Sequence, residues 1–333
     1  MKVKFGVFAD MHIDIMHDCE ERLAIFLEEC RKENVDFIIH LGDFVYPSNG
    51  LKCTCKPERT PANVKDALEN PCYVNKDKML EMYNGFEKPA YHVLGNHDCD
   101  MCTKEQMLAY TGAPGNYYSF DCGGFHFVAL DSNNMKLNGE FVSYANGNYF
   151  DQNGGTGIFP YLTDPQLEWL EKDLQQAKGP AILFSHYRLC KGNYCVYDQE
   201  KLREIIAKAP HGVMMGINGH DHTDTLFKVD NTWFWGVNSM SNCWLGTKFV
   251  CEGRYGKEID EKFKSIRYVA PYKDPVYAIV TLDENGASIK GTKSDYVGPS
   301  PEEMGVYAEG SKFVESNIKI TAEILDRELP WKK

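Results

Sequence analysis

The chain has 333 residues, of which 43% are hydrophobic and 25% are charged, as in ordinary globular proteins. This composition excludes a largely disordered chain, and no run of 18 apolar residues predicts a membrane span. Lys and Arg number 36 against 48 Asp and Glu. The resulting net charge of −12 makes nucleic acid and anionic membranes unlikely partners.

The first residues, Met1 to Val7, run directly into an apolar, strand-like segment. They lack the apolar core and the small-residue cleavage site of a signal peptide, so we expect a cytoplasmic protein. In a reducing compartment the twelve cysteines are expected to be thiols or metal ligands rather than disulfides.

Predicted strands alternate with predicted helices through the first two thirds of the chain. Short apolar runs predict strands over residues 3–9, 36–41, 90–94, 125–130, 181–184 and 212–217. Apolar residues at helical spacing predict helices over 20–34, 164–178 and 199–209. Thr163, with Gln166 three residues later, predicts a capping box at the start of the second helix. The alternation indicates an α/β fold.

The pattern changes to hairpins after residue 224. Strands are predicted over 225–229 and 232–237, and again over 276–282 and 287–290. We expect one large domain over 1–294, followed by a C-terminal extension over 295–333 with a helix at about 311–329. Two long irregular stretches, about 47–75 and 132–162, exceed the usual loop length and are expected near a functional site.

Residue types that bind metals follow five of the predicted strands. The segments are Asp10-Met11-His12, Gly42-Asp43, Gly95-Asn96-His97-Asp98, Ser185-His186 and Gly219-His220-Asp221-His222. In open α/β sheets, binding sites collect beyond the carboxyl ends of the strands, so these groups are expected to converge. Carboxylate, imidazole and amide donors suit manganese, iron or zinc. The candidates are too many for one ion, which favours a carboxylate shared by two cations.

The ordered set D-x-H, G-D, G-N-H-D, H and G-H-x-H resembles the calcineurin-like metallophosphoesterase superfamily. The resemblance implies a four-layer αββα sandwich of two mixed β-sheets flanked by helices. It also implies two divalent or trivalent transition-metal ions (Mn, Fe or Zn). One ion would be held by Asp10, His12 and His222, the other by Asn96, His186 and His220, with Asp43 between them. On an extended segment His220 and His222 would point the same way, and Asp221 would be structural.

The resemblance further implies a dinuclear metal-dependent phosphohydrolase, in which a metal-bound hydroxide attacks phosphorus. His97 matches the histidine that protonates the leaving oxygen, and Asp98 is placed to orient it. Arg188 is a candidate bidentate donor to a phosphate oxygen, although a surface role is equally compatible. The expected substrate is a small phosphomonoester or phosphodiester, nucleotide-derived ones included. A non-catalytic protein-interaction scaffold and a nuclease-type relative are the alternatives, and the complete ligand set favours the enzyme.

Several other residues allow two interpretations. Tyr46 stands where many relatives carry an acid, and we favour a role in packing or beside a ligand. Asp131 is a candidate for orienting a ligand, not for being one, and Tyr149 could stack on a base but is expected to pack. Buried packing roles are expected for His40, His92 and His126. A structural zinc is conceivable at a set of five cysteines, although free thiols are favoured there. These cysteines are Cys53, Cys55, Cys72, Cys99 and Cys102.

Overall fold

The computed structural model describes residues 1–13, 15–44, 76–100, 102–151, 160–191, 195–308 and 319–331. The predictions for Tyr46 and for the cysteines at 53, 55 and 72 lie outside the described residues, as does the stretch 47–75. The predicted strands and helices of the first two thirds are all present, each within two residues of the predicted ends.

The first of two six-stranded sheets contains the N-terminal strand at its centre. In sheet order its strands are β16 (Arg327–Pro330), β15 (Gly286–Gly291), β14 (Ala278–Asp283), β1 (Lys2–Phe8), β2 (Phe37–His40) and β3 (Ala90–His92). β1, β2 and β3 run parallel, whereas β14 is antiparallel to β1. The carboxyl ends of the three parallel strands therefore lie at one edge of the sheet.

The second sheet has a parallel centre and an antiparallel hairpin at each side. In sheet order its strands are β10 (Thr225–Val229), β11 (Thr232–Gly236), β9 (Val213–Asn218), β8 (Ala181–Ser185), β5 (Phe125–Ala129) and β4 (Tyr118–Cys122). β11, β9, β8 and β5 are parallel, and the hairpins are formed by β10 with β11 and β4 with β5.

The two sheets pack face to face around an aromatic core. Phe5 of β1 meets Phe127 and Phe184 of the second sheet edge-on, at centroid distances of 5.9 and 5.8 Å. Such pairs add to the free energy gained by burying the rings. The alternation of a strand turns Val7 toward this core and its neighbour Phe8 toward the outer helices.

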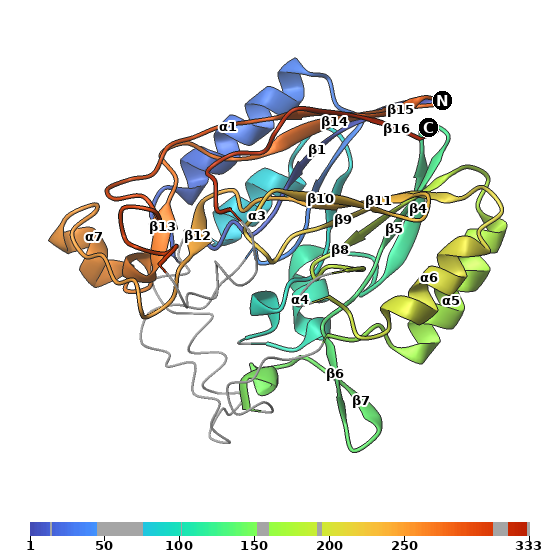
Figure 1. The fold of residues 1–333 in the computed structure, drawn as a ribbon, viewed down its shortest axis with the longest axis horizontal. Helices are drawn as coiled ribbons and strands as arrows, with labels where there is room; N and C mark the ends of the chain where they lie inside the picture. Colours follow the sequence, from blue (N-terminus) through green and yellow to red (C-terminus); the bar gives the residue numbers. More distant parts are fainter. Residues whose placement is uncertain are drawn as a thin grey trace.

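Helices cover the outer face of each sheet (Figure 1). α1 (Cys19–Lys32) and α3 (Lys76–Asn84) share a second apolar cluster with the first sheet, and α5 (Asp164–Gln176) and α6 (Gln199–Ala207) share a third with the second. The predicted αββα sandwich is confirmed.

Shorter elements fill the connections. They are η2 (His97–Cys99), α4 (Lys104–Thr111), β6 (Asn134–Leu137), β7 (Glu140–Ser143), η3 (Asn148–Asp151), β12 (Asn242–Trp244), α7 (Lys257–Lys262), η4 (Ile266–Tyr268) and β13 (Val269–Pro271). The stretch 132–162 is thus less irregular than predicted, because its described part contains the β6–β7 hairpin and η3.

The predicted capping box at Thr163 is wrong. Thr163 makes no capping hydrogen bond with its side chain, and the Gln166 side chain instead contacts the backbone of Asp131 at the end of β5. A capping box is present at α4, where Thr103 and Gln106 bond each other's backbone. At Thr163, the tertiary contacts of the buried Gln166 side chain take the place of the predicted capping box.

The predicted C-terminal helix is not found in the described residues 319–331, which contain β16. Ile320, Ala322 and Ile324 are all buried, a period of two that belongs to an extended chain rather than a helix. β16 pairs with β15, so the end of the chain extends the first sheet. Residues 311–318 of the predicted helix lie outside the described residues, and the domain boundary at 294 stays a prediction.

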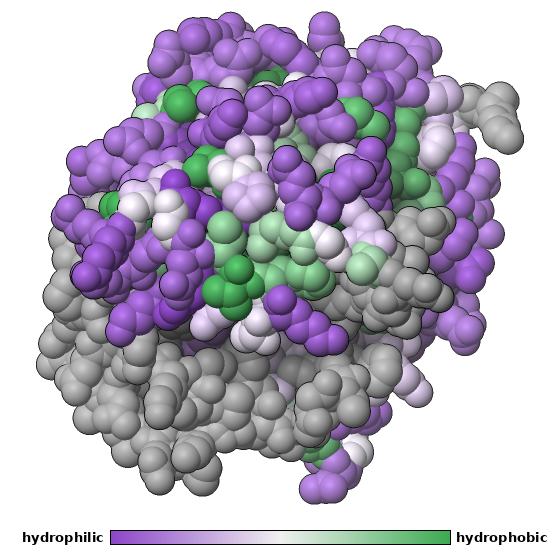
Figure 2. All heavy atoms as spheres, turned by 60° about the vertical axis from the view of Figure 1, so that its left-hand side comes forward, coloured by the Kyte–Doolittle hydropathy of each residue, from purple (hydrophilic) through white to green (hydrophobic). Residues whose placement is uncertain are grey.

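Where the described residues are seen on the face that bears α7, hydrophilic side chains predominate, with a green area near the centre and further hydrophobic atoms at the upper edges (Figure 2). Within the described ranges, none of the helices combines the length and the apolar run that crossing a bilayer requires. The cytoplasmic location stays a prediction.

Candidate active site

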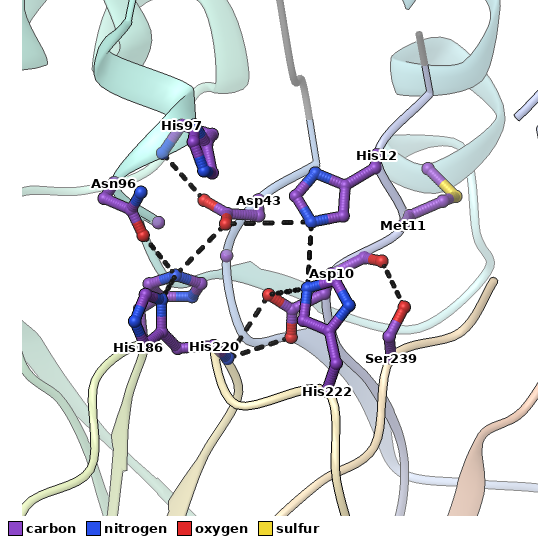
Figure 3. Close-up of polar contacts among 12 residues, drawn as sticks. Asp10, Met11, His12, Asp43, Asn96, His97, His186, His220, His222 and Ser239 are labelled. Carbon is purple, nitrogen blue, oxygen red and sulfur yellow. Dashed lines mark hydrogen bonds and ion pairs between the residues drawn. The ribbon is translucent and has the colours of Figure 1, made fainter. Parts of the chain in front are cut away.

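Five strand ends bring the predicted metal ligands together (Figure 3). The ligand segments follow β1, β2 and β3 of the first sheet and β8 and β9 of the second. A bridge between Ala9 and Ser239 joins the two sheets at this edge, and the Ser239 hydroxyl donates to the backbone oxygen of Asp10 at 2.8 Å. The site therefore lies where the carboxyl ends of both sets of parallel strands meet.

The first group consists of Asp10, His12 and His222, whose ligand atoms all lie within 4.8 Å of one another. His12 Nε2 is 3.1 Å from His222 Nε2, which is 3.5 Å from a carboxylate oxygen of Asp10. His222 Nδ1 is 2.9 Å from the carbonyl oxygen of Asn242. Because a carbonyl only accepts, Nδ1 donates, and the Nε2 of a neutral His222 directs its lone pair at the group.

The second group consists of Asp43, His186 and His220, and Asn96 lies beside it. His186 Nδ1 donates to the backbone oxygen of Leu41 at 2.8 Å. His186 Nε2 lies 2.9 Å from Asn96 Oδ1 and 3.2 Å from His220 Nδ1. The second set of donor atoms therefore also converges.

Asp43 lies between the two groups. Its Oδ2 is 3.3 Å from His186 Nε2 in one group and 3.9 Å from His12 Nε2 in the other. The carboxyl is almost fully buried, at 1% exposure. This is the position that a carboxylate shared by two cations requires.

The protonation states suit cation binding. Burial lowers the pKa of His12 and of His220, so both imidazoles are neutral, as metal ligands must be. Burial by itself raises the pKa of Asp43, but His186 and His97 bring it well below its ordinary value. Burial lowers the pKa of His186, yet Asp43 outweighs this and raises it to about 9, so a cation bound at this nitrogen would take the place of the Nε2 proton. The buried carboxylate thus attracts positive charge, and the surrounding nitrogen and oxygen donors fit Mn, Fe or Zn.

The backbone is strained at these ligands. Left-handed φ angles occur at Asp10 (52°), His12 (50°), Asp43 (52°), His220 (67°) and His222 (50°). Such conformations cost on the order of 1–3 kcal/mol for a non-glycine residue and cluster at functional sites. The prediction of an extended segment at His220 and His222 is wrong, because the Asp221 N–H turns back to Gly219 O at 2.8 Å. Because of this turn, the His222 imidazole lies in the first group of ligand atoms and the His220 imidazole lies in the second.

Two glycines allow the loops to approach closely. A Cβ on Gly95 would lie 2.1 Å from Asp43 Oδ1, and a Cβ on Gly42 would lie 2.6 Å from Gly95 N. Gly42 also has a φ of 96°, which disfavours other residues. The loop that carries Asp43 can therefore lie directly against the loop that carries Asn96.

His97 lies beside the bridging carboxylate, but its expected partner differs. The His97 N–H donates to Asp43 Oδ1 at 2.9 Å, and its Nδ1 is 2.8 Å from Asp100 Oδ2. Asp98 instead accepts the backbone N–H groups of Asp43 and Gly95, at 2.9 and 2.8 Å. Residues three apart share a face of a 3₁₀ helix, and η2 begins at His97, so Asp100 and not Asp98 contacts the imidazole.

Arg188 is buried in an ion pair rather than solvated at the surface, and its phosphate contact stays a prediction. Its Nε and Nη2 lie 3.1 and 2.7 Å from one carboxylate oxygen of Asp221, and its guanidinium lies over the ring of Phe227. The residue is only 5% exposed. Since Asp221 stands between His220 and His222, the ion pair holds the loop that carries two of the proposed ligands.

The remaining candidates have structural contacts. His40 and His92 contact each other, and His126 lies between two aspartates, as expected of packing residues. Asp131 pairs with the buried Lys104. Burial raises the pKa of Cys102 to about 12, so this thiol is protonated. Within the described part of the chain, the groups of His, Cys, Asp and Glu that could hold a metal contain no cysteine.

Comparison with known proteins agrees with this geometry. The family model described as calcineurin-like phosphoesterase matches residues 3–224. The chain belongs to the calcineurin-like phosphoesterase family. This membership confirms the predicted family and makes the protein a phosphoric ester hydrolase.

Two relatives illustrate the range of similarity to this phosphoesterase. A manganese-dependent ADP-ribose/CDP-alcohol diphosphatase of Arabidopsis thaliana is 23% identical over 233 residues, which is 58% of this chain and 67% of the relative. The crystal structure of a dimetal phosphatase from Danio rerio matches with a TM-score of 0.59 and 15% identity, covering 90% of this chain and 99% of that one. The second likeness supports the fold.

Asp43→Asn should abolish the pairing of cations, because it removes the charge between the two groups while keeping an oxygen for the His97 N–H. Equilibrium dialysis with metal analysis should find two Mn²⁺ per wild-type chain and fewer than one in the variant. Asp36→Asn is the control, since Asp36 is at the opposite end of β2, where it binds the Lys4 N–H. A variant that still binds two ions would contradict the assignment of Asp43.

Arg188→Met should lower the free energy of unfolding by about 3 kcal/mol, because it leaves the Asp221 carboxylate, which is only 11% exposed, without its cation. Chemical denaturation measures this change. Arg203→Met is the control: Arg203 pairs with Asp230 on the surface, and its loss should have little effect. Unchanged stability together with a raised KM would instead point to a phosphate contact.

Proposed function

We propose that this phosphoesterase is a dinuclear metal-dependent hydrolase of small, nucleotide-derived phosphoesters and diphosphates, with His97 as the general acid. The observation that carries the proposal is the placement of Asp43 between two groups of converging donor atoms, with His97 at its side. If this site failed to bind cations, the proposal would lose its basis.

The ligands divide between the two ions by position. Asp10, His12 and His222 would hold one ion and Asn96, His186 and His220 the other, with Asp43 shared. When bound, such cations offset the charge of the phosphoryl oxygens and acidify the water that serves as the nucleophile. The side chains around them supply orientation and proton transfer.

His97 is suited to give a proton to the leaving oxygen. Its Nδ1 is directed at Asp100, so proton delivery falls to Nε2 on the other side of the ring. Burial lowers the pKa of His97, but Asp100 and Asp43 outweigh this and raise it above its ordinary value. A histidine with a raised pKa remains protonated near neutral pH, as a general acid must.

The net charge of the chain and the name of one relative both bear on the substrate class. A net charge of −12 disfavours long polynucleotides as substrates. The Arabidopsis relative is named for ADP-ribose and CDP-alcohols, small nucleotide-derived diphosphates. We therefore propose the same chemical class here.

A substrate panel tests the proposed function. The Mn²⁺-loaded protein should be assayed with ADP-ribose, CDP-choline, p-nitrophenyl phosphate and bis-p-nitrophenyl phosphate. We expect hydrolysis of at least one nucleotide diphosphate, and its loss in Asp43→Asn. Inactivity toward the whole panel with two ions bound would favour a non-catalytic scaffold.

His97→Asn should lower kcat by about two to four powers of ten, because it removes the proton donor. Metal analysis should still find the wild-type content of Mn²⁺, since the contact of His97 with Asp43 is made by its backbone N–H. Steady-state kinetics with the best substrate of the panel measures the effect. A fall of less than tenfold would exclude His97 as the acid.

Asp100→Asn should move the alkaline limb of the pH profile of kcat/KM to lower pH. Activity falls as pH rises through the pKa of His97, and Asp100 is a cause of the raised pKa. Removing its charge lowers that pKa, so activity is lost earlier on going to alkaline pH. An alkaline limb that stays in place or moves upward would contradict the assigned pairing.

A further inference from the structure

Tyr149 lies behind the proposed acid, in the stretch 132–162 that the sequence marks as unusually long. It belongs to η3 and is only 2% exposed. Its ring stacks on Tyr144, with 4.5 Å between centroids. Tyr149 is thus packed among other side chains, which favours packing over stacking on a base.

The turn before Tyr149 is fastened to the loop that carries His97. The N–H groups of Asn146 and Gly147 donate to the backbone oxygens of Cys102 and Cys99, both at 3.0 Å. These bonds fix where the phenol meets η2, so the position of the Tyr149 hydroxyl follows from the backbone of both segments.

The hydroxyl of Tyr149 contacts both the proposed acid pair, His97 and Asp100, and the proposed metal ligand Asn96. It donates to Asp100 Oδ1 in a short hydrogen bond, while Asp100 Oδ2 holds His97 Nδ1 at 2.8 Å. It accepts from Asn96 Nδ2 at 3.1 Å. Its oxygen is also 3.3 Å from His97 Nδ1. One hydroxyl therefore links the acid pair to a proposed metal ligand.

The directions of these bonds are determined by chemistry. A phenol has one proton, and an ionised carboxylate only accepts, so the proton goes to Asp100. The phenol oxygen must then accept from the amide nitrogen of Asn96, which only donates. This leaves Asn96 Oδ1 pointing at His186 Nε2, 2.9 Å away, in the orientation that a ligand oxygen requires. A phenylalanine would supply neither bond.

We propose that Tyr149 is a positioning residue, whose hydroxyl, oriented by Asn96, holds Asp100 so that His97 presents Nε2 to the leaving oxygen. This inference rests on the proposed function. With both oxygens bonded, the Asp100 carboxylate cannot rotate, and the imidazole keeps one orientation. Without the hydroxyl, Oδ1 loses one hydrogen bond, and the acid is held by one contact fewer.

If Tyr149 positions the acid, its loss should slow the hydrolysis of some esters more than that of others. A poor leaving group such as an alkoxide needs a proton as the ester bond breaks, whereas p-nitrophenolate leaves without one. Loss of a residue that only orients the acid should therefore slow alkyl esters more than p-nitrophenyl esters. Contacts of this kind are typically worth about 10- to 100-fold at metal sites.

The test compares Tyr149→Phe with wild-type enzyme at saturating Mn²⁺. The substrates are the p-nitrophenyl ester and an alkyl ester of the same phosphate, in the class of ester that the wild type hydrolyses. We expect the ratio of the two kcat/KM values, p-nitrophenyl over alkyl, to rise about tenfold in the variant. Because both esters are hydrolysed by the same folded molecules, partial unfolding cancels from this ratio.

Tyr118→Phe is the matched control, since it also removes a buried hydroxyl that both donates and accepts, here with the backbone of His92. Its ratio should equal that of the wild type. An unchanged ratio in Tyr149→Phe, whether the rates fall equally or not at all, would overturn the inference and leave the proposed function intact. A wild type that hydrolyses neither ester, nor any compound of the panel, would overturn both.

Discussion

A buried carboxylate surrounded by imidazole nitrogens is the constraint on which the rest of the site depends. Asp43 is 1% exposed and lies within 4 Å of imidazoles from both sheets. Hydrogen bonds to Leu41 and Asn242 turn the second nitrogens of His186 and His222 inward. Such an arrangement is costly unless positive charge lies between the donors. Two cations would meet this need, and a pair of cations would also neutralise the oxygens of a phosphoryl group.

The fold supplies the free energy that holds this unfavourable cluster in place. The two sheets bury an aromatic core between them, and helices cover both outer faces. On this rigid base the loops tolerate left-handed backbone at five of the seven proposed ligands. The Arg188–Asp221 pair and the Ser239 hydroxyl then fasten the loops that carry His220 and Asp10. The free energy gained by burying the core thus offsets the cost of the strained backbone at the site.

Much of this molecule could be predicted from its sequence, for identifiable reasons. Apolar periodicity located the strands and helices, and the residue types at the strand ends identified the seven side chains that the structure brings together; their role as ligands stays a proposal. Asp100 was missed because only the 3₁₀ turn at His97 shows that the residue three positions on shares its face. The burial of Arg188 was not foreseen because its partner Asp221 is distant in sequence, and the final strand was missed because its partner β15 is likewise distant in sequence.

The central claim is that Asp43 lies between two cations. Crystals grown with Mn²⁺ and measured at its absorption edge test this directly, because anomalous scattering locates each ion. We expect two peaks, roughly 3.5 to 4 Å apart, on either side of the Asp43 carboxylate. A single peak, or two peaks that both lie away from Asp43, would contradict it.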